Sequence, residues 1–169
     1  ILKHFVRDNL YFRRSMHDLA GYYGCEPKAE AVIEARKSQN YAELSRRMFR
    51  EANLTHWLID DGIWSDQLMS IAQSKTHLPE VKIGRVLRLE VELAKLVEAH
   101  DSAASLFQAF EAQLRAEAAN LIGFKSIVAY RTGLNIVRYP MPEVEKAYSE
   151  IRHGLVKGTP PRIANKPVL

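Results

Sequence analysis

Cysteine and long apolar runs are scarce or missing in this 169-residue chain, and each absence excludes a class of protein. The only cysteine, Cys25, cannot form an internal disulfide. A single cysteine is typical of a reducing compartment, so we expect a cytoplasmic protein. No apolar run approaches the length of a membrane span, so we expect no membrane partner.

Several catalytic signatures are also missing. Six histidines occur, but none belongs to an H-x-H pair or to an H-E-x-x-H helix motif. The sequence has no glycine-rich phosphate loop, G-x-S-x-G elbow or C-x-x-C pair. The net charge is +4, but the basic residues are scattered among acidic ones and form no tract, which disfavours a nucleic-acid partner.

Hydrophobic periodicity predicts a helical first part, followed by strands that alternate with helices. Strands are expected over residues 55–59, 81–89 and 123–131. Helices are expected over residues 2–23, 27–38, 41–52, 65–75 (beginning at Ser65-Asp66), 91–99 and 103–121, after Pro140, and from Ile163. Strands separated by helices favour a parallel sheet, and hence an α/β protein. Both ends of the sequence fall within expected elements, so we expect a fragment.

Charged residues follow or end each expected strand. They are Asp60 and Asp61, then Arg88 and Glu90, then Lys125 and Arg131. The carboxyl ends of parallel strands lie at one edge of a sheet and are where α/β proteins bind ligands. The pattern therefore indicates a ligand site, although charges can also simply mark where strands leave a core.

The segment GFKSIVAYRTGL at 123–134 is the most informative stretch. Because side chains alternate along a strand, Lys125 and Arg131 are expected on one face, together with Ile127 and Ala129. Two cations on a mostly buried strand need carboxylates, an anionic ligand or a metal-site network. The alternative is that both lie near strand ends and reach water or a structural carboxylate.

Four pieces of the sequence resemble a known family. They are YFRRSMHDLAGYYGCEP (11–27), LIDDG (58–62), RVLRLE (85–90) and GFKSIVAYRTGL (123–134). In this order they resemble the metal-dependent amidohydrolases of the TIM-barrel type, in the branch found alone or fused to glutamine synthetase. The resemblance implies part of a (β/α)8 TIM barrel, with a helical insert at 1–54 and the units of about strands 2–4 at 55–169.

The resemblance also implies a chemistry. A divalent metal, zinc or a similar ion, would activate water, with its ligands mostly outside this segment, so the segment alone is expected to be inactive. The substrate would be a small carboxylated or amide-containing molecule, cleaved by a hydrolase or a related lyase. The alternative is a non-catalytic scaffold or regulatory barrel that associates with a glutamine-synthetase-like partner. A homo-oligomer is possible in either case.

The resemblance implies site residues as well. Lys125, Asp61 and Glu90 would be catalytic, and Arg88 and Arg131 would bind the substrate. In some members of the family the corresponding lysine is carboxylated and bridges two metals, and the sequence leaves this open for Lys125. Asp61 is preferred over the neighbouring aspartate if Trp57 and Ile59, which share its strand face, point inward.

Overall fold

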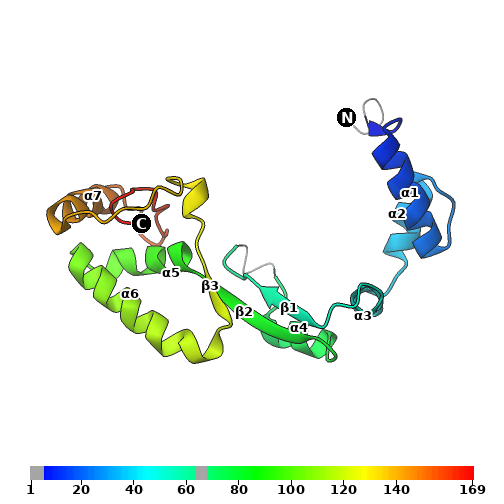
Figure 1. Ribbon diagram of the computed structural model, residues 1–169, viewed down its shortest axis with the longest axis horizontal. Coiled ribbons are helices and arrows are strands. Elements are labelled where there is room, and N and C mark those ends of the chain that lie inside the picture. The colour runs from blue at the N-terminus through cyan, green and yellow to red at the C-terminus, as the bar shows by residue number, and fades with distance from the viewer. Residues whose placement is uncertain (1–5, 64–67) are drawn as a thin grey trace. The chain divides into compact units, whose positions relative to one another are not determined.

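The computed structural model describes residues 6–63 and 68–169, and its contacts divide the chain into two units, Ile1–Leu54 and Thr55–Leu169. The first unit contains α1 (Leu10–Tyr23), α2 (Ala29–Lys37) and α3 (Tyr41–Glu51). The second contains β1 (His56–Ile59), α4 (Ile71–His77), β2 (Lys82–Arg88), α5 (Leu89–Leu96), α6 (Ala103–Glu117), β3 (Gly123–Lys125) and α7 (Met141–His153) (Figure 1). No helix in the described part of the chain has the length and hydropathy that a membrane span requires.

Capping residues mark the starts of α1 and α3 and the end of α1. The Asn9 and Asn40 side chains accept hydrogen bonds from the first turns of α1 and α3. Gly24 ends α1 at a φ of 70°, a left-handed conformation that glycine adopts without steric cost. The Arg47 guanidinium lies 3.8 Å from the centre of the Tyr22 ring and joins α3 to α1 by a cation–π contact.

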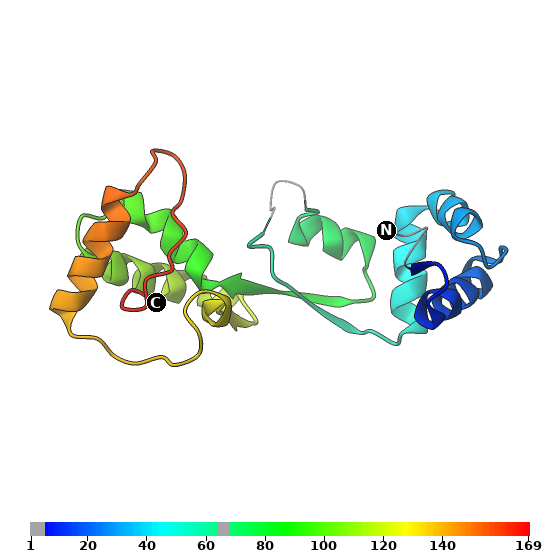
Figure 2. The same ribbon diagram turned by 90° about the horizontal axis from the view of Figure 1, so that it is seen from above.

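The sheet of the second unit has the order β1-β2-β3, and both strand pairs are parallel, as the alternation of elements predicts. Ile59 lies opposite Arg85 in the first pair, and Arg88 lies opposite Lys125 in the second. Figure 2 shows α4 beside the ribbon of β2, against which it packs. This register brings the carboxyl ends of the three strands together.

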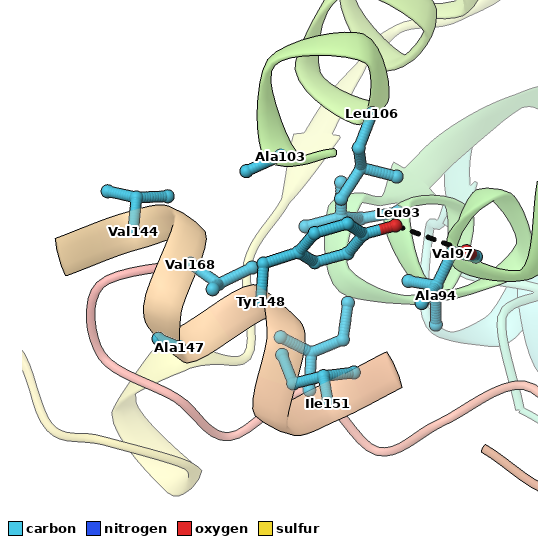
Figure 3. Close-up of a cluster of buried hydrophobic side chains, with 11 residues drawn as sticks. Leu93, Ala94, Val97, Ala103, Leu106, Val144, Ala147, Tyr148, Ile151 and Val168 are labelled. Carbon is cyan, nitrogen blue, oxygen red and sulfur yellow. Dashed lines mark hydrogen bonds between the residues drawn. The ribbon is translucent and has the colours of Figure 1, made fainter. Parts of the chain in front are cut away.

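The main hydrophobic cluster of the second unit lies where α5, α6 and α7 meet (Figure 3), while Ile83 and Leu87 of β2 are buried in the sheet. Tyr148 of α7 is 1% exposed and its ring fills the centre of this cluster. Its hydroxyl donates to the carbonyls of Val97 and His100, at 3.1 and 2.6 Å. Ile163 and Val168, in the irregular segment after α7, are also buried in the cluster.

The predicted TIM-barrel portion is wrong. The described residues form an open sheet of three parallel strands, in which β1 and β3 are edge strands, and they add no further strand that would close it. Closure requires every strand to be paired on both sides. The third strand is also much shorter than the expected 123–131, because the chain leaves the sheet after Lys125 and forms a 3₁₀ turn at Val128–Tyr130.

Three helix predictions also need correction. The helix expected over residues 2–23 begins at Leu10, because Asn9 caps it. The expected helix start at Ser65-Asp66 lies outside the described residues, and α4 begins after Ser70. There the Ser70 hydroxyl and the Gln73 side chain cap each other's backbone N–H groups. The helix expected from Ile163 does not form. Instead, the Ile163 carbonyl accepts a hydrogen bond from Arg131 and the segment packs into the core.

Candidate functional site

An ionic cluster lies at the carboxyl ends of the three strands. Asp60 follows β1, while Arg88 and Lys125 are the last residues of β2 and β3. Oδ2 of Asp60 accepts hydrogen bonds from Nε and Nη2 of Arg88, the Nε contact at 3.1 Å, and lies 2.8 Å from Nζ of Lys125. Its Oδ1 accepts from the Gly62 backbone N–H at 3.0 Å. One carboxylate therefore holds two cations that lie opposite each other in the sheet.

The charge of Asp60 is fixed by these neighbours. Burial would raise the pKa of the carboxyl, but the hydrogen bonds from Arg88, Lys125 and Gly62 outweigh it and lower the pKa to about 2. The exposed fractions differ, at 8% for the Arg88 side chain, 14% for Asp60 and 46% for Lys125. Lys125 is thus the member of the cluster that solvent, or a ligand, can reach.

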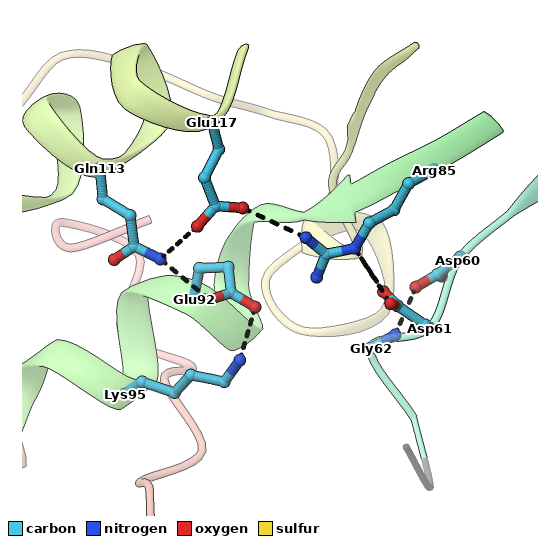
Figure 4. Close-up of polar contacts among 8 residues, drawn as sticks. All are labelled: Asp60, Asp61, Gly62, Arg85, Glu92, Lys95, Gln113 and Glu117. Carbon is cyan, nitrogen blue, oxygen red and sulfur yellow. Dashed lines mark hydrogen bonds and ion pairs between the residues drawn. The ribbon is translucent and has the colours of Figure 1, made fainter. Parts of the chain in front are cut away.

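Asp61 belongs to a different face and a different network. Both of its oxygens accept from Nε of Arg85 at 3.0 Å. Arg85 also donates to Glu117 at 3.2 Å, and Figure 4 shows the contacts continuing through Gln113 to Glu92. This network ties the end of β1 to β2, α5 and α6. The expectation that Asp61 is the inward acid of the cluster is therefore corrected, because Asp60 occupies that place.

The strand register explains why Asp60, and not Asp61, belongs to the ionic cluster. Ile59 and Arg85 are paired, so their side chains lie on the same face, and Asp61, two residues after Ile59, continues that face. Asp60 and Arg88 lie on the opposite face, because each is an odd number of residues away from that pair. Alternation alone separates the two aspartates, but only the register tells which of them meets Arg88.

Glu90 lies in the first turn of α5, not on a strand, and its side chain is 4% exposed. Its Oε1 accepts from the Ser126 hydroxyl and from the Ile127 N–H, the latter at 2.9 Å. The Ser126 oxygen in turn accepts from the Val128 N–H at 3.1 Å. These bonds satisfy backbone donors that would otherwise extend β3, which explains why the strand stops at Lys125.

Arg131 is separated from Lys125 by this turn, so the prediction of a shared strand face is wrong. Its Nη1 donates to the Ile163 carbonyl at 2.6 Å. Burial lowers the pKa of the guanidinium, while the charge of Glu90 opposes that shift and the charges of Arg162 and Arg88 add to it. Arg131 therefore connects the turn after β3 to the segment after α7. Its guanidinium also interacts electrostatically with Glu90 and Arg88.

The donor set at the strand ends does not fit a metal. Among residues 6–63 and 68–169, no group of three or more histidine, cysteine, aspartate or glutamate side chains could hold an ion. The carboxylate of Asp60 is already occupied by two cations, and Oε1 of Glu90 by two N–H or O–H donors. The arrangement instead resembles a site for the anionic group of a ligand.

The chain resembles one solved structure over most of its length, whereas no protein-family model and no curated protein matches it. That structure is a protein of Lactobacillus casei ATCC 334, provisionally described as a metal-dependent hydrolase. The two are 25% identical, with a TM-score of 0.75 and with 95% of this chain covered. The chain spans 41% of the length of that protein.

Proposed function

We propose that this chain is part of a metal-dependent hydrolase that acts on a small carboxylated or amide-containing substrate, and that Lys125 binds the anionic group of the substrate. The similarity to the Lactobacillus casei protein supports the reaction class. The exposed, anchored position of Lys125 at the carboxyl edge of the sheet supports the role of this residue, and it is the observation on which the proposal depends.

Lys125 is suited to this role because its ammonium group has donors to spare. Oδ2 of Asp60 lies on one side of Nζ of Lys125, at 2.8 Å, and the Lys125 side chain is nearly half exposed. An ammonium group has three N–H donors, so two remain for a carboxylate. Asp60 also keeps the neighbouring Arg88 charge compensated, so the two cations can lie side by side.

In this proposal the remaining charged residues position their neighbours and do not contact the substrate. Arg88 orients Asp60, and Asp61 fixes β1 to Arg85. Glu90 holds the turn after Lys125 and thereby sets the direction of the lysine. The metal would supply Lewis acidity and an activated water, but its ligands must come from outside the described residues, so the chemistry at the metal is left to those groups.

A hydrolysis assay on the native protein tests the proposal. N-acyl amino acids and their carboxamide analogues are incubated with zinc or manganese, and release of the free amine is measured. We expect Lys125→Ala to raise KM for the carboxylated substrate by about tenfold, the value of one charge-assisted hydrogen bond, with little effect on the carboxamide. Lys125→Arg should restore part of the affinity.

Lys95→Ala is the matched control, because this lysine is also about half exposed and also pairs with a carboxylate, that of Glu92. It should leave both substrates unaffected. The proposed function is refuted if chelation of metal leaves hydrolysis unchanged. The role of Lys125 is refuted if its alanine variant has the KM of the wild type for the carboxylated substrate.

A further inference from the structure

A cavity of about 410 Å³ lies in the second unit, and none of Asp60, Arg88 and Lys125 lines it. Its walls come from α5, α6, α7, the segment before α7 and the segment after it. The apolar residues of the walls include Leu93, Phe107, Phe110, Val144 and Val168. Val137 and Met141 are 50% and 48% exposed, so the cavity opens to solvent on their side. Its size suits a small ligand.

Two polar side chains of this lining have no partner among the described residues. Arg138 lies between the exposed apolar residues of the mouth and forms no ion pair there. The neighbouring Tyr139 lines the same cavity, and its hydroxyl forms no hydrogen bond with the described residues. Both groups can donate hydrogen bonds, and a guanidinium presents its donors as a fork that matches a carboxylate.

Glu90 is the acidic residue of the lining, and its contacts decide how strongly its charge acts on a ligand in the cavity. Oε1 of Glu90 accepts hydrogen bonds from Ser126 and Ile127, and its Oε2 is buried and has no hydrogen-bond partner among the described residues. The charge of Glu90 is also partly balanced by that of Arg131. The exposed charge in the lining is therefore that of Arg138, and the rest of the lining is apolar except for Glu90, Ser126 and Tyr139.

We propose that this cavity binds a small apolar monocarboxylate, with the carboxylate on Arg138 at the mouth and the hydrocarbon body between α5, α6 and α7. Charge complementarity selects the acid, and the apolar walls select a branched or aromatic body over a short one. The proposal does not depend on the proposed hydrolysis, since it needs neither a metal nor turnover.

The first test varies the ligand and leaves the protein unchanged. Binding of 4-methylpentanoate is measured by calorimetry or by amide NMR shifts in the presence of EDTA. Two probes serve as controls: 4-methylpentanamide, which keeps the body and loses the charge, and acetate, which keeps the charge and loses the body. We expect each control to bind at least about tenfold more weakly, as removal of a charge-assisted contact or of several buried methylene groups implies.

The second test varies the mouth of the cavity. Arg138→Gln should weaken binding of 4-methylpentanoate by about tenfold, and Val137→Trp should abolish it by blocking the opening. Both residues are exposed, so neither change should disturb folding. Arg115→Gln is the control, because Arg115 is an exposed arginine of α6 that does not line the cavity. It should bind as the wild type does.

The outcomes separate this inference from the proposed hydrolase. Lys125→Ala should leave binding of 4-methylpentanoate unchanged, because Lys125 does not line the cavity. Equal affinity for the acid and its amide would overturn the inference, as would unchanged binding in Arg138→Gln. Acetate binding as tightly as 4-methylpentanoate would also overturn it, since that result would show an anion site without an apolar cavity.

Discussion

The carboxylate of Asp60 accepts two hydrogen bonds from the guanidinium of Arg88, although the two residues are 28 positions apart. Both side chains are largely buried, at 14% and 8% exposure. Burial makes each of them depend on the other, because a charge withdrawn from water without a partner is costly. The contact joins the ends of β1 and β2 and places Lys125 beside them.

Replacement of Asp60 by asparagine should therefore destabilise the second unit. The neutral amide leaves Arg88 buried without a counter-charge, and we expect a loss of about 3 kcal/mol in the free energy of unfolding. Urea denaturation followed by circular dichroism measures it. Asp18→Asn is the control, since Asp18 is 65% exposed and pairs only at the surface, and it should have almost no effect. A loss no larger than that of the control would contradict the structural role of Asp60.

The same contact predicts how stability depends on pH. The folded pKa of Asp60 is about 2, below its ordinary value of 3.8. The native state therefore binds this proton less readily than the unfolded chain. The stabilisation is complete above about pH 4 and is lost as the pH falls towards 2, a change of about 2 kcal/mol. Unfolding curves between pH 6 and pH 2 should show this loss, and the loss from this group should be missing in Asp60→Asn.

Gly84, in the middle of β2, should not tolerate a side chain. A Cβ atom built there would lie 2.1 Å from Cγ1 of Ile122. We expect Gly84→Ala to cost about 2 kcal/mol through this overlap, and Ile122→Ala in the same protein to recover part of the loss. Gly123→Ala is the control, because a Cβ at that position meets nothing within 4 Å. Thermal unfolding of the three variants and of the double variant completes the cycle. A double variant no more stable than Gly84→Ala would argue against the overlap.

Removal of the Tyr148 hydroxyl tests the core of the second unit. In Tyr148→Phe the carbonyls of Val97 and His100 lose one donor but keep the guanidinium of Arg152. We therefore expect a loss of about 1 kcal/mol, the ordinary value of one hydrogen bond. Tyr130→Phe should be neutral, since Tyr130 is 86% exposed. Chemical denaturation of both variants decides the matter, and equal stability would show that Arg152 alone satisfies the two carbonyls.

Local sequence signals predict most helices of this protein well. The apolar spacing of residues 41–52 predicts α3, and Pro140 before an apolar stripe predicts α7. The helix expected from Ile163 does not form, because tertiary contacts decide the conformation of that segment. The Arg131 side chain donates a hydrogen bond to the Ile163 carbonyl, and the side chains of Ile163 and Val168 are buried in the hydrophobic cluster.

The candidate site divides in the same way. The sequence alone determines that charges follow the strands and that neighbouring aspartates on a strand face opposite ways, because these depend only on residue order and on strand alternation. The alternation of strands and helices favours parallel pairing, which the structure confirms. Only the tertiary structure decides that Asp60, and not Asp61, meets Arg88 and Lys125, and that Glu90 ends β3 after three residues. Strand register and contacts between distant side chains are set by packing of the whole unit, and no local pattern encodes them.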